Sequence, residues 1–380
     1  MQSNGRTPYG QLVGECHTER IWRELSLSAE VERRQTEILD FNKKHKWRKR
    51  GLAMIPTQYG VNFPVKYLNQ AGSQVLLYTD GTVLVTHAGV EMGQGLNIKV
   101  IQIAAQALGV DVSNVHIAEC ASDRVNNTSP TAASMGADLN GMATLNACEQ
   151  IRERLGPVVE EFPDKSFPEI CMIAYKRQIP LAAYGFYASP FGGVHKWRLQ
   201  GETSDTSTDS NSKRGDIFNY FAYGASCSEV ELDVLSGLWE VKRADLLMDV
   251  GDSLNTAIDI GQVEGAFVQG MGRWTLEDIR FNETSGKMTT TSPHSYFIPT
   301  SADVPKDFRV TLLGDSAMKT AVHSSKAVGE PPFFLSSSVY FAIKECIVAA
   351  REEEWGGGRK GHVRIDAPLT VDKIVGACKI

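Results

Sequence analysis

The sequence predicts an α+β fold in which mixed sheets pack against helices. Several stretches alternate apolar and polar residues and are joined in pairs by tight turns, as in β-hairpins. Longer stretches between them repeat apolar residues at helical spacing. With 42% hydrophobic and 22% charged residues in 380, the chain has the composition of a globular protein with a sizeable core.

The N-terminal region is predicted to be helical, and the region after it to form strands. Residues 18–46 are rich in charged helix formers and carry Ile21 and Leu25 at helical spacing, which predicts helical structure. Residues 52–65 and 73–87 are strand-like, and the second stretch contains Asp80-Gly81 between two apolar runs, a strong hairpin signal. We therefore divide the chain into a helical connection (1–47), a main domain (48–350) and a C-terminal segment (351–380).

Helices and strands continue to alternate through the main domain. Residues 97–110 predict a helix ending at Gly109, and residues 113–120 return to strand character. A second helix is expected over 136–155. Residues 199–214 contain almost no apolar side chain and predict an exposed loop.

The last third of the chain adds a hairpin and two helices. Residues 227–250 alternate apolar and polar side chains around the turn 236–237, which predicts a second hairpin. Residues 258–279 predict a buried helix despite their glycines. Residues 335–354 predict a helix closed by the glycines at 356–358.

Composition and charge exclude several classes of protein. A net charge of −6 gives no support for nucleic-acid binding. No apolar run approaches the roughly 18 residues that a membrane span needs, and the N-terminus lacks a secretory apolar core. The seven cysteines are scattered without a C-x-x-C pair, which argues against a metal or iron–sulfur site held by this chain. They favour a reducing cytoplasmic location, with the peroxisome as the alternative.

Two segments ahead of predicted helices could let a polyanionic cofactor approach the backbone. In 89–95 (GVEMGQG), glycines expose amide groups near a helix N-terminus, and the amide of Gln94 can both donate and accept. An ordinary strand–helix turn explains the same pattern. In 128–136 (TSPTAASMG), hydroxyls and free amides predict an anion site, or simply a helix N-cap.

Two later segments carry further candidates. The glycines of 259–265 (DIGQVEG) do not match a dinucleotide fingerprint, and close helix packing explains them better. In 326–334 (KAVGEPPFF), Glu330 stands alone among a glycine, two prolines and aromatic residues, as expected for a desolvated acid that transfers protons. A surface turn with Glu330 facing a helix dipole is the alternative.

Taken together, these segments closely resemble the xanthine dehydrogenase and aldehyde oxidase family. The resemblance implies the family's second molybdenum-cofactor subdomain, wrapped around molybdopterin at the junction of two lobes. The matching strings follow the family's order and are RGLAMIPTQYGVNF, NQAGSQVLLYTDGTVLVTHAGVEMGQGL, NNTSPTAASMGADLNG, YGASCSEVELDVLSG, LMDVGDSLNTAIDIGQVEGAFVQGMG and SSKAVGEPPFFL.

The resemblance also implies roles for individual residues. Glu330 matches the family's catalytic glutamate, the base that activates a water-derived oxygen at molybdenum for transfer to an electron-poor carbon of the substrate. The metal is held through the pterin and by no side chain of this chain. The expected cofactor contacts are Met92, Gly93, Gln94, Ala133, Ser134 and Gln262.

The expected substrate is a purine such as hypoxanthine or xanthine. The prolines after Glu330 favour the xanthine branch over aldehyde oxidases, and Phe63 matches a ring that stacks on the purine. Tyr59 stands where the family usually has phenylalanine. Pro64 replaces the usual threonine and removes a donor, so an aldehyde substrate is the alternative.

The family pattern further implies a longer parent enzyme. In the family, two 2Fe-2S modules, an FAD domain and the first molybdenum subdomain precede this region, and the parent forms a homodimer. We therefore expect the chain to be an incomplete part that is inactive alone, with a truncated, non-catalytic module as the third hypothesis. Residues 194–214 resemble an insertion, which a loop accommodates at small entropic cost.

Overall fold

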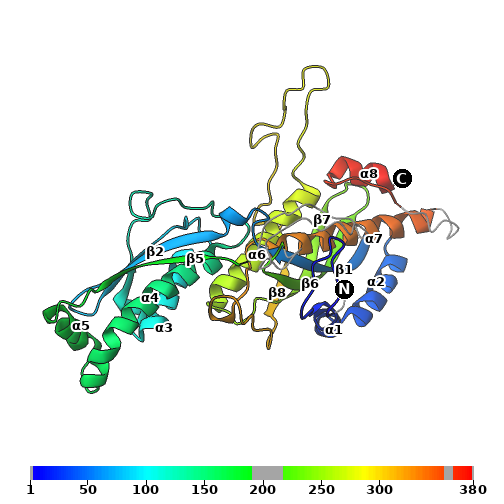
Figure 1. Cartoon of the computed structure of the whole chain (residues 1–380). Coiled ribbons are helices and arrows are strands. Elements are labelled where there is room, and N and C mark those ends of the chain that lie inside the picture. The colour runs from blue at the N-terminus through cyan, green and yellow to red at the C-terminus, as the bar shows by residue number, and fades with distance from the viewer. Residues whose placement is uncertain (1–2, 191–216, 355–362, 379–380) are drawn as a thin grey trace, which may run out of the picture.

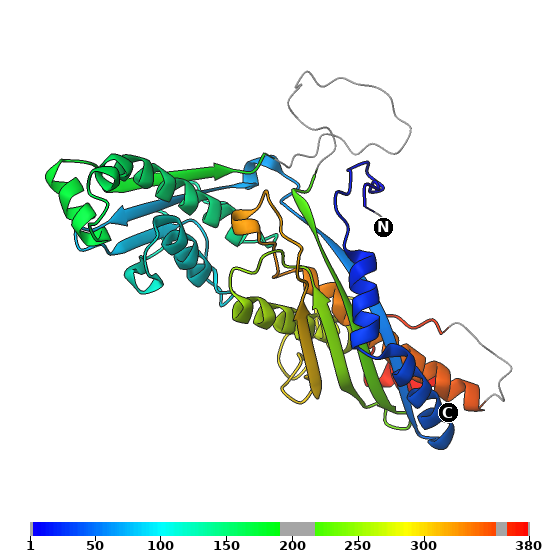
Figure 2. The same cartoon turned by 90° about the horizontal axis from the view of Figure 1, so that it is seen from below.

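The computed structural model describes residues 3–190, 217–354 and 363–378, which form two lobes placed end to end (Figures 1 and 2). Each lobe has its own four-stranded sheet, with strand orders β4-β3-β2-β5 and β1-β6-β7-β8. Both sheets mix antiparallel and parallel pairs and pack against helices. The α+β prediction is confirmed.

The first lobe is built around the predicted hairpin at Asp80-Gly81. The two hairpin strands pair antiparallel, and the next strand joins them in parallel after a helical crossover. Helices α3 and α4 pack on each other, and α4 covers β2 and β5. The elements are β2 (Gln70–Leu77), β3 (Val83–His87), α3 (Leu96–Leu108), β4 (Val115–Ile117), α4 (Gly136–Glu161), α5 (Phe167–Lys176) and β5 (Ala182–Ala188).

The second lobe carries helices on both faces of its sheet. Along β6, Phe221 and Tyr223 face the core under α1, whereas Tyr220 and Ala222 face the larger core under α6 and α7. The predicted hairpin at 236–237 joins β6 and β7. The elements are α1 (Thr18–Ser28), α2 (Val31–Lys44), β1 (Arg48–Val61), β6 (Tyr220–Asp233), β7 (Trp239–Met248), α6 (Thr256–Thr275), β8 (Asp307–Leu312), α7 (Ser337–Glu354) and α8 (Val371–Cys378).

Some predicted boundaries were wrong. The helical stretch expected over 18–46 is confirmed, but it is divided into two helices, because Glu30 between α1 and α2 adopts the left-handed conformation (φ 54°). The strand expected over 113–120 is limited to Val115–Ile117. A 3₁₀ turn, Pro331–Ser336, precedes α7. The expectations for 194–214 and for the glycines at 356–358 fall outside the described residues.

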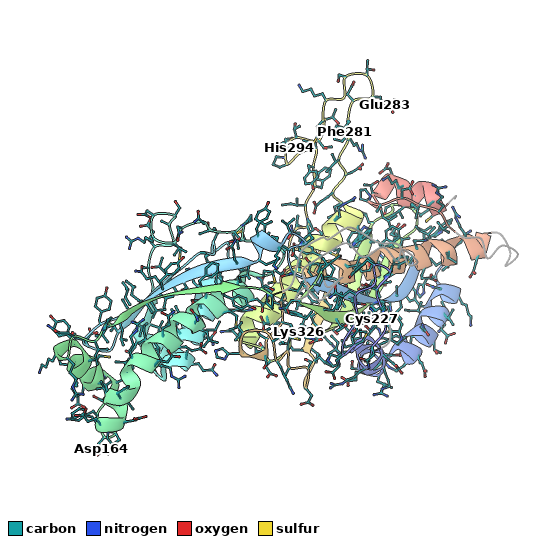
Figure 3. The ribbon with its side chains drawn as sticks, viewed as in Figure 1. Asp164, Cys227, Phe281, Glu283, His294 and Lys326 are labelled. Atoms are coloured by element: carbon teal, nitrogen blue, oxygen red, sulfur yellow. The ribbon has the colours of Figure 1, made fainter. Side chains whose placement is uncertain are left out.

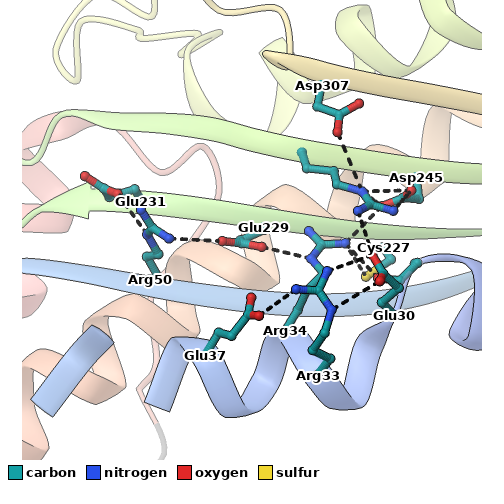
Figure 4. A network of polar contacts seen from close by, with 12 residues as sticks. Glu30, Arg33, Arg34, Glu37, Arg50, Cys227, Glu229, Glu231, Asp245 and Asp307 are labelled. Carbon is teal, nitrogen blue, oxygen red and sulfur yellow. Dashed lines mark hydrogen bonds and ion pairs between the residues drawn. The ribbon is translucent and has the colours of Figure 1, made fainter. Parts of the chain in front are cut away.

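A buried arginine ties the N-terminal helices to the second sheet (Figure 4). Arg34 of α2 contacts Glu229 and Asp245 at 2.9 Å each, and its side chain is only 4% exposed. Arg243 donates to the other oxygen of Asp245 at 2.7 Å. Since a buried charge is tolerated only when it is paired, this network fixes α2 on the sheet.

Two further features bear on packing and exposure. The stretch Pro331–Glu352 is long and apolar enough to cross a membrane, but half of it is buried and α7 packs against β1 and β6 as a core helix.

Between α6 and β8, an arm that includes Phe281, Glu283 and His294 projects away from both lobes (Figure 3). Phe281 is 61% exposed and pairs with Met288 in an isolated bridge.

Candidate functional site

Glu330 lies where the two lobes meet, and residues from both of them hold its carboxylate. Its Oε2 accepts hydrogen bonds from Tyr59 Oη at 2.6 Å and from Ser134 Oγ at 3.1 Å. The Glu330 amide in turn donates to Ser134 Oγ at 2.8 Å. Tyr59 comes from β1 in the second lobe, and Ser134 precedes α4 in the first. Three predicted site residues therefore meet in one cluster.

An unusual backbone brings Ser134 to Glu330. Ala133 and Ser134 both have φ 54°, in the left-handed region that costs non-glycine residues energy. Gly329 allows the close approach, because a Cβ there would lie 3.3 Å from Ser134 Oγ and would have to displace that hydroxyl slightly. The cluster thus depends on two consecutive strained residues facing a glycine.

Gln262 lies beside this cluster with an uncommitted amide. A Cβ at Gly329 would be 3.8 Å from Gln262 Oε1, which places the amide beside Gly329, the residue before Glu330. The side chain is half-buried, and it makes no hydrogen bond to another described residue. An amide that can both donate and accept fits a ligand rich in heteroatoms, such as a pterin.

The turn 89–95 satisfies its own amides. Glu91 Oε1 accepts from the amides of Gly93 and Gly95 at 3.0 Å, and its Oε2 accepts from that of Asn97 at 2.8 Å. Gln94 accepts from the Met92 amide at 2.6 Å and donates to a backbone carbonyl of the same turn. The negative charge expected at the start of α3 is therefore supplied by Glu91, which the sequence reasoning did not single out.

Met92, Gly93 and Gln94 accordingly stand apart from the Glu330 cluster. The Met92 side chain is 67% exposed, and Gly93 has open space around it. In the part of the chain described, no hydrogen bond links these three residues to Glu330. The turn contacts the segment before α4 instead, where the Val90 amide donates to Thr131 Oγ1 at 2.9 Å.

A cavity of about 590 Å³ opens beside the cluster. Glu330, Tyr59, Pro64 and Ala133 all lie on its wall. Phe63 does not, because its side chain is 8% exposed and packs in the large core. The remaining lining residues are Thr7, Pro8, Tyr9, Gln58, Gly60, Asn62, Phe218 and Phe221.

Buried polar groups support the segment that carries Glu330. Lys326 Nζ contacts Asp249 Oδ2 at 2.5 Å, with side chains 5% and 0% exposed (Lys326 is labelled in Figure 3). Tyr220 Oη accepts from the Ala327 amide at 2.8 Å and donates to Asp138 Oδ2 at 2.7 Å. None of these residues was predicted from the sequence to serve the site. The only local signal is the presence of ionisable groups within otherwise apolar stretches.

Burial changes the acidity of two groups here. It raises the pKa of Asp138 to about 6, although the Tyr220 hydrogen bond and the charge of Lys99 act in the opposite direction. Burial also raises the pKa of Tyr59 above its ordinary value, and the carboxylate of Glu330 raises it further. Tyr59 therefore remains protonated, and a hydrogen-bond donor, at physiological pH.

The sequence matches a protein-family model and several known proteins. Residues 24–305 match the family model described as the molybdopterin cofactor-binding domain. The chain is 49% identical over 372 residues to the xanthine dehydrogenase of Dictyostelium discoideum, covering 98% of the chain and 26% of that relative. It is 46% identical to the xanthine dehydrogenase/oxidase of Mus musculus, covering 94% and 26%. The chain thus spans about a quarter of the length of these relatives.

Solved structures share the fold. The chain superposes on CO dehydrogenase from Oligotropha carboxidovorans with a TM-score of 0.78 at 16% identity, covering 100% of this chain and 47% of the other. It superposes on quinoline 2-oxidoreductase from Pseudomonas putida 86 with a TM-score of 0.80 at 20% identity, covering 99% and 47%. At these identities the likeness is one of fold.

Proposed function

The chain belongs to the molybdopterin cofactor-binding domain family, and from that premise we propose that it is the second part of the molybdenum domain of a xanthine dehydrogenase-type hydroxylase. Its identity of 44% or more to eight xanthine dehydrogenases, over at least 94% of its length, supports this assignment. Because it spans about a quarter of their length, the activity proposed belongs to a larger polypeptide.

The arrangement of Glu330 carries the proposal. One oxygen of its carboxylate accepts two hydrogen bonds, and the side chain lines a cavity large enough for a bicyclic heterocycle. A carboxylate held in this way can accept a proton from a group positioned in the cavity. We assign Glu330 as the general base of the reaction.

The residues around Glu330 fit a bound molybdopterin in part. Ala133, Ser134 and Gln262 would hold it, since the strained backbone and the uncommitted amide lie together beside Glu330. The other expected contacts are Met92, Gly93 and Gln94. Their turn now forms hydrogen bonds to Glu91 and within itself, and these bonds would have to break before the three residues could bind the cofactor. When bound, the cofactor supplies a redox-active metal centre that takes two electrons from the substrate.

Two residues of the cavity wall support a flat, aromatic substrate. Tyr59 and Pro64 would flank a flat heterocycle, and we propose a purine such as hypoxanthine or xanthine. Stacking by Phe63 requires its side chain to leave the core. Pro64 has no N–H and no hydroxyl to offer a purine, which makes an aldehyde the second candidate.

The proposed parent enzyme would carry further redox centres. We place its 2Fe-2S and FAD centres in other parts of that polypeptide, where they accept the electrons released at the molybdenum site. The parent is proposed to be a cytoplasmic homodimer. The alternative, a non-catalytic module, predicts a folded chain that binds no cofactor.

The test uses the complete polypeptide that contains this chain. Its molybdenum content and its oxidation of xanthine and of an aldehyde are measured for the wild type and for Glu330→Gln. We expect the variant to keep its molybdenum and to lose turnover by at least about 100-fold, since general-base catalysis contributes on the order of 10²–10⁴.

The matched control is Glu345→Gln, which removes an exposed carboxylate from α7 and should leave turnover unchanged. Full turnover by Glu330→Gln, or a wild-type protein that binds no molybdenum, contradicts the proposed function. Faster oxidation of the aldehyde than of xanthine selects the second candidate.

A further inference from the structure

The two oxygens of the Glu330 carboxylate have different surroundings. Oε2 accepts from Tyr59 Oη at 2.6 Å and from Ser134 Oγ at 3.1 Å. Across residues 3–190, 217–354 and 363–378, no group donates to Oε1. One oxygen is thus held by protein donors, while the other remains available on a side chain that borders the cavity.

The backbone of β1 fixes the position of Tyr59. The residue pairs with Ala222 in the antiparallel register between β1 and β6, and its side chain packs against the large core. The next residue, Gly60, leaves room for Phe218, because a Cβ there would lie 2.4 Å from the Phe218 ring and would have to displace it. A donor mounted on a strand is more rigidly placed than one on a loop.

The hydroxyl of Tyr59 adds a function that a phenylalanine ring would lack. Phenylalanine fills nearly the same volume but cannot donate to a carboxylate. A hydroxyl that donates to an ionised carboxylate makes a charge-assisted bond, which is about twice as strong as a bond between neutral groups. Its 2.6 Å length is typical of such bonds.

We propose that Tyr59 is a positioning residue for Glu330, whose hydroxyl holds Oε2 so that Oε1 is left to accept a proton in the cavity. This inference rests on the proposed function, in which Glu330 is the base. It gives Tyr59 a role through Glu330, beyond contact with a substrate. Ser134 supplies the second donor, but it also binds the Glu330 amide and so cannot be altered without disturbing the loop.

The first experiment tests the contact between Tyr59 and Glu330 in protein that carries no cofactor. A fluorinated tyrosine, which is more acidic than tyrosine, replaces Tyr59 in the full chain, and its ionisation is followed by ¹⁹F NMR. The same analogue at Tyr67, whose side chain is 69% exposed, is the control. We expect a higher titration midpoint at position 59 than at 67, and a fall of about one pH unit at position 59 in Glu330→Gln.

The second experiment measures catalysis by the complete polypeptide. We expect Tyr59→Phe to lower kcat roughly tenfold and to leave KM within about twofold, because the donor acts on the base and not on substrate binding. Tyr67→Phe should match the wild type. Tyr59→Phe combined with Glu330→Gln should be no slower than Glu330→Gln alone, since the hydroxyl acts only through the carboxylate.

The outcomes separate the inference from the proposed function. If Glu330→Gln leaves the titration midpoint at position 59 unchanged, the contact between Tyr59 and Glu330 is overturned. A midpoint that responds, together with an unchanged kcat in Tyr59→Phe, overturns the positioning role. If the midpoint responds but the wild-type polypeptide binds no molybdenum and oxidises neither substrate class, the contact stands and the proposed function fails.

Discussion

Two loops predicted to serve the same site are held in opposite ways. Apart from one bond from Val90 to Thr131, the turn 89–95 is held by local hydrogen bonds: Glu91 and Gln94 accept from amides, and Gln94 donates to a carbonyl, all within six residues. The segment 326–330 is held by partners distant in the sequence, including Asp249 and Ser134. The first loop would keep its shape with few tertiary contacts, and the second is defined by them.

This difference indicates how each loop can respond to a ligand. Local bonds from flexible side chains can be exchanged one for one with bonds to a bound molecule, so the turn can open at small cost. Buried partners cannot be exchanged in this way, so the segment that carries Glu330 is already organised without a ligand. Substitutions beneath Glu330 should therefore be far more costly than substitutions in the turn.

The largest effect is expected from the buried ion pair beneath Glu330. Lys326→Met leaves Asp249 charged and unpaired in the core, which should lower the free energy of unfolding by about 3–5 kcal/mol, as measured by urea denaturation. Adding Asp249→Asn removes that charge and keeps an acceptor for the Gly251 amide, so the double variant should recover part of the loss. A single variant as stable as the wild type would mean that the segment is not anchored here.

These two loops also show what the sequence could and could not predict. The hairpin at Asp80-Gly81 and the end of α3 at Gly109 follow from local turn chemistry, and both were predicted. Glu330 stood out because of its neighbours in the sequence. Its partners Tyr59 and Ser134 are 271 and 196 residues away, so only the packing of the two lobes reveals them.

Features that depend on tertiary contacts were not predicted. No glycine or proline marks the break at Glu30. Its position coincides with contacts to the sheet, where Arg34 of α2 pairs with Glu229 and Glu30 pairs with Arg243. Capping of the turn by Glu91 was predictable in principle, because an acidic residue shortly before a helix often satisfies its first amides. The buried position of Phe63 depends on core packing that no local pattern encodes.

A smaller, pH-dependent effect is expected at Asp138, which supports the segment through Tyr220. The pKa of Asp138 is raised to about 6 in the fold from an ordinary value of 3.8. Its protonated form therefore contributes stability that is fully present below about pH 4 and is lost as the pH rises through about 6. Asp138→Asn does not titrate, so between about pH 4 and pH 7 its stability should gain roughly 2 kcal/mol relative to the wild type.

Urea denaturation at several pH values measures this difference. The control is Asp164→Asn, at the exposed tip after α4, which should show no such trend (Figure 3). A difference between Asp138→Asn and the wild type that stays constant with pH would mean that Asp138 is not buried in its neutral form beneath the segment.

The smallest effects give the sharpest contrast, between two glutamines expected to hold the same cofactor. Gln94→Ala removes two hydrogen bonds within the turn and should lower the free energy of unfolding by about 1 kcal/mol. Gln262→Ala removes no hydrogen bond to a described residue and should stay within about 0.5 kcal/mol of the wild type. If both side chains hold a cofactor, both variants should retain less molybdenum, although only one of them loses stability. If both variants lost the same stability, the Gln262 amide would already form hydrogen bonds in the protein. The two glutamines would then not differ in their availability to a ligand.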